Sequence, residues 1–438
     1  MKVLVVGSGA REHALMWKLS RSPQKPEMFC APGNAGTATI GTNVDLRTDK
    51  PGALALWAVE NKIDLTIVGP EAPLADGLVD TFVDRGLKIF GPTKAASRLE
   101  SSKSFAKDVM LKAGVNTAKG AVFEDYDKAV EYVRKEGAPI VVKADGLASG
   151  KGVVVAQSVD EAVEALESFM IHNRLGDSGK RVVVEECLIG EEASVMALVD
   201  GTTVLPLVVS QDYKRVGDND EGPNTGGMGS ISPTPVLSDK RVENLVGEIF
   251  LPVLRELHSR GIHYSGFLYA GLLVDRAGVA RVLEFNCRLG DPETEVLMMR
   301  LKSDFLSVVQ AAVSVQLVTT ELEWYPDSAA CVVAASRGYP GKVDDGKAIT
   351  GLPAGNDTLQ VFHGGTKQNP DHPEETLSAG GRILAVTARG ETLEVAREKA
   401  YSALEQIRFD GMHYRKDIGA KAVAVVADQA AGVKKDRA

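Results

Sequence analysis

Polar residues with ligand chemistry alternate along one apolar segment, at Glu284, Asn286 and Arg288. The apolar run 279–283 before them and the Gly-Asp-Pro break after them predict the end of a β-strand. Alternate side chains of a strand project to one face, so these three would share a face. A carboxylate and an amide oxygen suit a Mg²⁺ ion that also keeps water and phosphate oxygens, and an arginine fork grips phosphate or carboxylate. The segment predicts a magnesium–phosphate site; the alternative is a solvated strand face with an ordinary ion pair.

A second candidate is the glycine-rich stretch from Lys143 to Gly152. Its Gly, Ala and Ser residues would let backbone amides approach phosphate oxygens. The Walker A pattern is absent, because Gly152 follows Lys151 where that pattern requires serine or threonine. The stretch predicts a phosphate-covering loop of another kind, with a plain β-hairpin bearing solvated lysines as the alternative.

The N-terminus begins like a dinucleotide fingerprint, with Gly7-Ser8-Gly9 after an apolar run. Glu12 stands where the third glycine belongs, and no acidic residue for a ribose is clear, so a nicotinamide site is disfavoured. A phosphate held by backbone N–H groups at the start of the following helix is favoured. The alternative is a tight turn with no ligand.

Two more segments could line a pocket. The stretch 185–188 ends a predicted strand and could offer backbone groups to a purine edge, with Glu192 for ribose hydroxyls; a structural hinge fits it equally well. The stretches 211–215 and 224–229 share the polar segment 210–235, for which we predict no regular structure. Such long loops inside a domain are usually functional. Their mixed charges and glycines suit a carboxylate-and-phosphate pocket, and a surface charge run is the alternative.

Apolar periodicity predicts the elements that position these residues. Residues 1–100 alternate strands and helices, which predicts a parallel α/β sheet with ligands at the strand C-termini. A helix with a Ser97…Glu100 capping box follows, and a hairpin turns at Asp200-Gly201. The predicted strands are 3–6, 28–31, 63–68, 88–90, 140–143, 153–156, 182–185, 195–199, 204–209, 331–335 and 383–386. The predicted helices are 12–20, 52–60, 74–85, 97–112, one from Ser158, and 392–407, before a polar tail.

Composition bounds the class of protein. A chain of 438 residues predicts two to four domains at roughly 100–200 residues each. The net charge of −9 argues against bulk nucleic-acid binding, so any anionic ligand needs local cations. The four scattered cysteines suit a reducing compartment. We see no signal sequence and no apolar run long enough for a bilayer, and we therefore expect a cytoplasmic protein without membrane contact.

Together these segments resemble the ATP-grasp superfamily and, within it, the phosphoribosylamine–glycine ligase family. The resemblance covers nearly the whole chain. The segments that carry it are 5–14, 31–36, 68–74, 143–153, 210–215, 222–229, 266–271, 284–293 and 415–419.

The resemblance implies an α/β fold, in part α+β, with ATP-grasp architecture. An N-terminal parallel α/β sheet domain would span residues 1–101 and bind substrate. A two-lobed ATP-grasp region would span 102–322, with a mobile lid lobe at about 120–190. A small C-terminal α/β domain would span 323–427, before a flexible tail at 428–438.

The implied reaction joins glycine to 5-phosphoribosylamine with ATP in purine biosynthesis, giving glycinamide ribonucleotide, ADP and phosphate through glycyl phosphate. Mg²⁺, or alternatively Mn²⁺, is the implied metal. The implied partners are these small molecules, with no nucleic acid and no membrane, and we expect a monomer, with a weak dimer as the alternative.

The resemblance also implies residue roles. Glu284 and Asn286 would bind the metal, and Arg288, Asp212 and Lys143 would act in catalysis. The ATP-binding residues would be Lys103, Lys143, Gly150, Lys151, Gly152, Glu185, Leu188, Glu192 and Lys214. The substrate-binding residues would be Gly9, Asn34, Glu71, Asp212, Thr225, Gly226, Gly227, Met228 and Arg288.

Three other functions compete with this one. The nearest is another ATP-grasp ligase, such as a carboxylase acting on an aminoimidazole ribonucleotide or on biotin. A non-catalytic nucleotide-binding regulator would bind ATP without turnover. An NAD-dependent dehydrogenase is disfavoured by the broken fingerprint.

Overall fold

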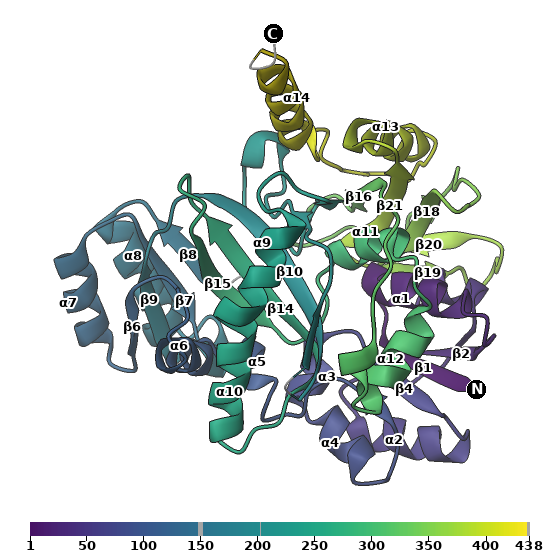
Figure 1. Cartoon of the computed structure of the whole chain (residues 1–438), viewed down its shortest axis with the longest axis horizontal. Helices are drawn as coiled ribbons and strands as arrows, with labels where there is room; N and C mark the ends of the chain where they lie inside the picture. The colour runs from purple at the N-terminus through teal and green to yellow at the C-terminus, as the bar shows by residue number, and fades with distance from the viewer. Residues whose placement is uncertain (148–151, 202, 436–438) are drawn as a thin grey trace.

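The computed structural model describes residues 1–147, 152–201 and 203–435, and its N-terminal sheet is parallel as predicted (Figure 1). The sheet order is β3-β2-β1-β4-β5. Helices lie on both faces, so the strands bury both of their sides and read as apolar runs. The strands are β1 Lys2–Gly7, β2 Glu27–Pro32, β3 Thr42–Asn43, β4 Leu65–Val68 and β5 Ile89–Phe90; the first helices are α1 Ala10–Ser20 and α2 Pro51–Glu60.

Two predicted helices are broken in the structure. The helix predicted at 74–85 is α3 Glu71–Ala75 and α4 Leu78–Val83, because Gly77 between them takes a left-handed φ of +86°. The helix predicted at 97–112 is α5 Arg98–Ser101 and α6 Lys103–Lys112, separated by the extended residue Ser102. The predicted capping box is wrong, since Ser97 Oγ donates to the carbonyl of Lys94 and Ser102 caps α6 instead.

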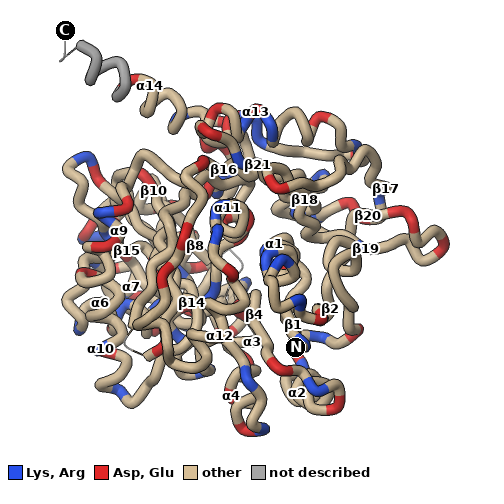
Figure 2. The backbone as a smooth tube through the Cα atoms, turned by 45° about the vertical axis from the view of Figure 1, so that its right-hand side comes forward, with Lys and Arg blue, Asp and Glu red and all other residues tan. Residues whose placement is uncertain are grey.

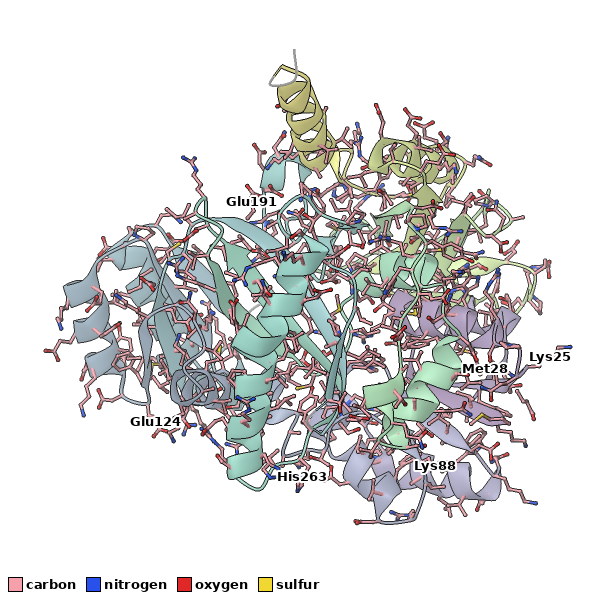
Figure 3. All side chains as sticks on the ribbon, viewed as in Figure 1. Lys25, Met28, Lys88, Glu124, Glu191 and His263 are labelled. Carbon is pink, nitrogen blue, oxygen red and sulfur yellow. The ribbon has the colours of Figure 1, made fainter. Side chains whose placement is uncertain are left out.

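A separate antiparallel lobe follows, with sheet order β6-β9-β7-β8. Apolar residues of α7 and α8 pack on one face of it, and Ser158 caps α8 as predicted, accepting a bond from the Glu161 N–H at 3.1 Å. Figure 3 labels Glu124 on this lobe and Lys25 and Lys88 on the N-terminal domain at the other side of the molecule. The elements are β6 Gly120–Phe123, α7 Tyr126–Glu136, β7 Ile140–Ala144, β8 Val153–Ala156, α8 Val159–Leu166 and β9 Val182–Glu186.

A central antiparallel sheet has the order β11-β10-β14-β15. The predicted hairpin at Asp200 is confirmed, because Asp200 pairs with Thr203. One face packs on α9 and α10, and the other on α11 and α12. The elements are β10 Glu191–Asp200, β11 Thr203–Pro206, α9 Asp239–Leu245, α10 Leu251–Ser259, β14 Ser265–Val274, β15 Ala280–Asn286, α11 Glu293–Arg300 and α12 Phe305–Val313.

The C-terminal sheet, ordered β12-β13-β16-β21-β18, takes two strands from the segment 210–235. The prediction that this segment lacks regular structure is therefore wrong for its two short strands. A smaller sheet has the order β17-β20-β19, and α14 extends through Lys435 into the predicted tail, projecting from the body of the molecule (Figure 2). The elements are β12 Gln211–Asp212, β13 Gly229–Ser232, β16 Ser328–Ala335, β17 Ala348–Ile349, β18 Leu359–His363, β19 Thr366–Gln368, β20 Thr376–Ser378, β21 Arg382–Gly390, α13 Leu393–Leu404 and α14 Ala420–Lys435.

Arg415 fastens the rest of the segment 210–235 to the C-terminal domain. Its buried guanidinium donates to Asp417 at 2.7 and 2.8 Å and to Asp220 at 2.9 Å. The backbone N–H of Lys416 donates to Asp218 at 2.7 Å. A bidentate arginine–carboxylate pair of this kind fixes both position and orientation. The segment 415–419 therefore has a structural role, which is to hold the 210–235 segment on the C-terminal domain.

Two histidines join the N-terminal and C-terminal domains. His13 Nδ1 accepts the backbone N–H of His363 at 2.8 Å. Burial, reinforced by His363, lowers the pKa of His13 to about 3, and burial lowers the pKa of His363 to about 4. Both imidazoles are therefore neutral in the folded protein near neutral pH.

We expect acid to weaken this junction. An unfolded histidine takes a proton near pH 6.5, whereas the folded ones stay neutral until about pH 3 to 4. The unfolded state binds more protons in this window, so stability falls as the pH falls from 6.5 to 4. His13→Asn keeps an acceptor for the His363 N–H and removes one proton site. Urea unfolding at pH 7.5, 6.5, 5.5 and 4.5 should show a pH slope smaller by up to about 1.4 kcal/mol per unit. Equal slopes in both proteins would contradict this.

Candidate active site

The end of β15 carries the predicted metal ligands. Glu284 pairs with Gly271 of β14, where the register shifts, and a Cβ at Gly271 would lie 3.3 Å from Glu284 Cγ. At this bulge the Leu283 side chain is only half-buried, and its carbonyl accepts a bond from Lys143 at 3.1 Å. Asn286 is buried, and its Oδ1 accepts a bond from Arg288 at 3.1 Å.

Cations surround Glu284. The ammonium of Lys214 lies 3.9 Å from Glu284 Oε1 and 2.9 Å from Glu192 Oε2. Burial opposes ionisation of Glu284, but Lys214, Lys143, Lys103 and Arg288 together lower its pKa. The carboxylate is thus ionised within a local excess of positive charge, which a polyphosphate would balance.

The donor set fits a hard divalent cation. The Glu284 side chain is 42% exposed and has no ion pair shorter than 3.9 Å among the described residues. Within the described ranges no three His, Cys, Asp or Glu side chains gather as a metal cluster. Glu284 and Asn286 would therefore supply two oxygens and leave the other positions to water and phosphate, as Mg²⁺ prefers.

The predicted ATP-binding lysines lie next to this strand. Lys143, in β7, lies 2.6 Å from Glu185 Oε2, and Lys107 lies 2.8 Å from Glu185 Oε1. Burial alone would raise the pKa of Glu185, but these two lysines lower it. Glu185, predicted to bind adenosine, is here the shared partner of both lysines. Lys107 was missed, although its spacing of four from Lys103 places both on one face of α6.

The loop after β7 is described in part. Lys103 donates to the carbonyl of Gly146 at 3.0 Å, and the carbonyl of Gly152 accepts the Ala144 N–H at 2.8 Å, which closes the β7–β8 hairpin. Gly150 and Lys151 lie outside the described residues. Leu188 lies half-buried in the connector after β9.

Arg288 contacts carboxylates from the N-terminal part of the chain. Its guanidinium lies 3.2 Å from Glu71 and 2.9 Å from Glu100. Burial opposes its charge, but Glu100 and Glu71 raise its pKa. Burial also raises the pKa of Glu100 to about 7, against the pull of Arg288. Glu100 was missed because its spacing from Ser97 matched a capping box.

The segment 225–228 is positioned by Arg382 of β21, which donates to the carbonyls of Gly226 at 2.6 Å and Asp291 at 2.7 Å. Gly227 has a φ of +116°, and a Cβ there would lie 2.8 Å from Asp212 Oδ1. Thr225 Oγ1 accepts the Gly227 N–H at 2.9 Å. Met228, predicted to bind substrate, is fully buried in the core.

Asp212 is a half-buried acid beside this segment, with its Oδ1 atom turned away from solvent. Its Oδ1 has no hydrogen-bond partner among the described residues. Burial and the neighbouring Glu293 raise its pKa. Glu293 was not predicted; its side chain accepts a bond from Ser194 at 2.9 Å. Such an unpaired acceptor suits an amine N–H.

The glycine-rich N-terminal turn already holds an anion. Glu12 accepts the Gly9 N–H at 2.5 Å and lies 2.6 Å from Arg11 Nε. A Cβ at Gly7 would lie 2.5 Å from Glu12 Cγ. The Glu12 carboxylate therefore occupies the Gly9 N–H at the start of this helix. The phosphate site expected at this N–H stays a prediction.

Asn34 likewise differs from its predicted role. Its amide donates to the carbonyls of Ser8 and His363, and its oxygen accepts the N–H of Gly36 at 2.8 Å. These bonds occupy the side chain, so Asn34 positions the loop after β2 rather than offering a free polar group to substrate.

The predicted residues thus divide into three sets. The end of β15, Lys214, Asp212, Arg288 and Glu71 converge where the three domains meet. Lys143 and Glu185 lie beside them on strands β7 and β9 of the lobe, with Lys103 at the start of α6. Gly9, Asn34 and Met228 have their polar groups or side chains engaged within the protein. In the view of Figure 2 neither charge sign gathers on one side of the molecule. Across the described residues no helix is long and apolar enough to cross a membrane.

Sequence relatives match this chain over almost its whole length. The N domain model of phosphoribosylglycinamide synthetase matches residues 1–100, the ATP-grasp (A) domain model 101–294 and the C domain model 329–421. A phosphoribosylamine–glycine ligase of Neisseria meningitidis is 49% identical, covering 97% of this chain and 100% of the relative. One of Escherichia coli O157:H7 is 48% identical, covering 97% and 99%.

Solved structures agree in fold. The crystal structure of phosphoribosylamine–glycine ligase from Thermotoga maritima has a TM-score of 0.83 and 37% identity, covering 95% of this chain and 100% of that one. A biotin carboxylase domain from Hydrogenobacter thermophilus has a TM-score of 0.73 at 17% identity, covering 94% and 91%, and shows the shared ATP-grasp fold alone. The chain belongs to the phosphoribosylglycinamide synthetase family.

Proposed function

We propose that the protein ligates glycine to 5-phosphoribosylamine with ATP, giving glycinamide ribonucleotide, ADP and phosphate in purine biosynthesis. The names of its relatives support this activity. The observation that carries it in the structure is the 3.2 Å contact between Arg288 and Glu71. That contact sets the metal-ligand strand of the ATP-grasp region against the C-terminal edge of the N-terminal sheet, so two substrates can meet there.

The metal in this proposal is Mg²⁺, with Mn²⁺ as the alternative, held by Glu284 and Asn286. When bound, the metal would offset the negative charge of the ATP phosphates. Lys103, Lys143 and Lys214 would bind the phosphates, with the 150–152 stretch covering them. Glu192 and the 185–188 connector would hold the adenosine. The ion pairs of Lys143 with Glu185 and of Lys214 with Glu192 would have to open or share their cations with phosphate.

Two nucleophilic displacement reactions would then follow each other in the site. A carboxylate oxygen of glycine attacks the γ-phosphorus of ATP, the bond to the bridging oxygen breaks, and ADP leaves. The amine nitrogen of phosphoribosylamine attacks the carbonyl carbon of glycyl phosphate, phosphate leaves, and the nitrogen loses a proton. Arg288 would orient the anionic acyl phosphate, and Asp212 would accept an amine N–H. Positioning and electrostatic stabilisation suffice, without a covalent enzyme nucleophile.

The domain roles are part of this proposal. Residues 1–101 would hold the sugar phosphate amine, with Glu71 facing it, and 102–322 would hold ATP, with the β6–β9 lobe closing over it. Residues 323–427 would hold the 225–227 segment in place through Arg382. We further propose a cytoplasmic monomer, with a weak dimer as the alternative.

A coupled ADP-release assay tests the function. ADP release should require both glycine and freshly made phosphoribosylamine, and mass spectrometry should find glycinamide ribonucleotide. ADP release that requires bicarbonate instead would indicate a carboxylase of the same fold. ATP binding without turnover would indicate a regulator.

We predict that Glu284→Gln lowers kcat by roughly 100-fold or more, because the metal loses an anionic ligand where charge must be offset. Asn286→Ala should act in the same direction but more mildly. Glu248→Gln, which removes one exposed ion pair with Arg241, is the matched control and should leave kcat unchanged. Glu284→Gln activity within a few-fold of the wild type at saturating Mg²⁺ would rule out the assignment.

Glu71→Gln should separate the substrates. A charge-assisted bond contributes about 1.5–3 kcal/mol, so the KM for phosphoribosylamine should rise roughly 10-fold or more. The KM for ATP should stay within about threefold, since Glu71 belongs to the other domain. Steady-state kinetics with each substrate varied in turn provide the measurement. A raised KM for ATP with an unchanged KM for phosphoribosylamine would reverse the proposed domain roles.

A further inference from the structure

Arg288 pairs with two carboxylates that differ in their exposure to solvent. Glu71 is the more exposed, at 33% of its side chain, and lies 3.2 Å from Arg288 Nε. Glu100 is 7% exposed and lies 2.9 Å from the other end of the fork. Arg288 also donates to Asn286 Oδ1 and to the carbonyl of Leu289. These contacts engage all three guanidinium nitrogens and four of their five N–H groups, and Glu71 is the most exposed of the four partners. Glu71 is therefore the partner that an anionic substrate would replace.

Glu100 binds the strand end at two points. While Oε1 meets Arg288, Oε2 accepts the backbone N–H of Cys287 at 2.7 Å. One carboxylate thus fixes both the backbone before Arg288 and its side chain. Among the described residues, the Glu71 side chain has one hydrogen-bond partner, Arg288. Displacing Glu71 breaks one bond near solvent, whereas displacing Glu100 leaves a buried acid and a backbone N–H without partners.

The helix that carries Glu100 also reaches the nucleotide side. α5 ends at Ser101, and the extended residue Ser102 starts α6. The backbone N–H and hydroxyl of Ser104 bond to Asp145, at the stem of the glycine-rich loop, at 3.1 and 2.5 Å. Lys103 bonds to the carbonyl of Gly146 in that stem. The α5–α6 kink therefore connects Arg288 with the residues around the phosphate-covering loop.

We propose that Glu100 is the positioning residue for Arg288, and that Glu71 is the partner exchanged when the anionic substrate arrives. This inference rests on the proposed function, because the displacing anion is the carboxylate or acyl phosphate of the ligation. Glu100 holds the Arg288 guanidinium at the end of β15, while Arg288 Nε changes its partner from Glu71 to the anion. Glu100 itself touches no reacting atom.

A double-mutant cycle tests the coupling. Glu100→Gln alone should lower kcat roughly 10- to 100-fold, as expected for a misplaced catalytic group, with the KM for ATP within about threefold of the wild type. On an Arg288→Lys background the same change should lower kcat less than about threefold, because it acts through Arg288. Glu248→Gln controls for loss of one paired carboxylate elsewhere.

If Glu100→Gln lowers kcat by the same factor in the wild type and in Arg288→Lys, the proposal is wrong. Equal factors would mean that Glu100 acts independently of Arg288, as a merely structural residue would. If Arg288→Lys is too slow to assay, the crystal structure of Glu100→Gln decides: the proposal requires Arg288 to leave its position at the end of β15, and an unchanged Arg288 contradicts it. Wild-type turnover with glycine and phosphoribosylamine is measured in parallel. Its absence would refute the proposed function, whereas normal turnover with equal factors would refute only the role of Glu100.

Discussion

The guanidinium of Arg288 connects the two halves of the candidate site. It contacts Glu71 and Glu100 from the first hundred residues and Asn286 from its own strand. A planar fork with five donors can make these bonds at once, which a lysine ammonium cannot do with the same geometry. Without it, two largely buried carboxylates would face each other across the domain boundary. The packing of the N-terminal domain against β15 therefore depends on a cation that lies within the candidate site.

The charge pattern of the pocket follows from this arrangement. The protein is acidic overall, with a net charge of −9, but Lys103, Lys143, Lys214 and Arg288 all act on Glu284. Several of these cations are paired internally, Lys143 with Glu185 and Lys214 with Glu192. Polyphosphate entry would then exchange one set of ion pairs for another, rather than place bare charges together. The cations are therefore already held in position by carboxylates before ligands bind.

The sequence predicted several elements with continuous apolar runs, such as strands β1 and β2 and the lobe hairpin. The predicted elements did not include the apolar β14 and α12 or the short exposed strand β3. The breaks at Gly77 and Ser102 depend on local backbone angles that periodicity does not report. Strands β12 and β13 were missed because they are short and largely polar, and they form by long-range pairing, β13 with β16 and β12 with β13. Glu100 was hidden for a similar reason, because its partner lies 188 residues further along the chain at Arg288.

The broken fingerprint at the N-terminus has a physical explanation in Glu12. Its carboxylate fills the space that a Cβ at Gly7 or Gly69 would need, and it accepts the Gly9 N–H. A third glycine at this position would leave the helix N-terminus open to a pyrophosphate, as in dinucleotide folds. With Glu12 there, the positive end of α1 is neutralised from inside the protein and Arg11 is turned toward the carbonyl of Leu289. The same parallel sheet therefore presents Glu71 toward Arg288 at its C-terminal edge.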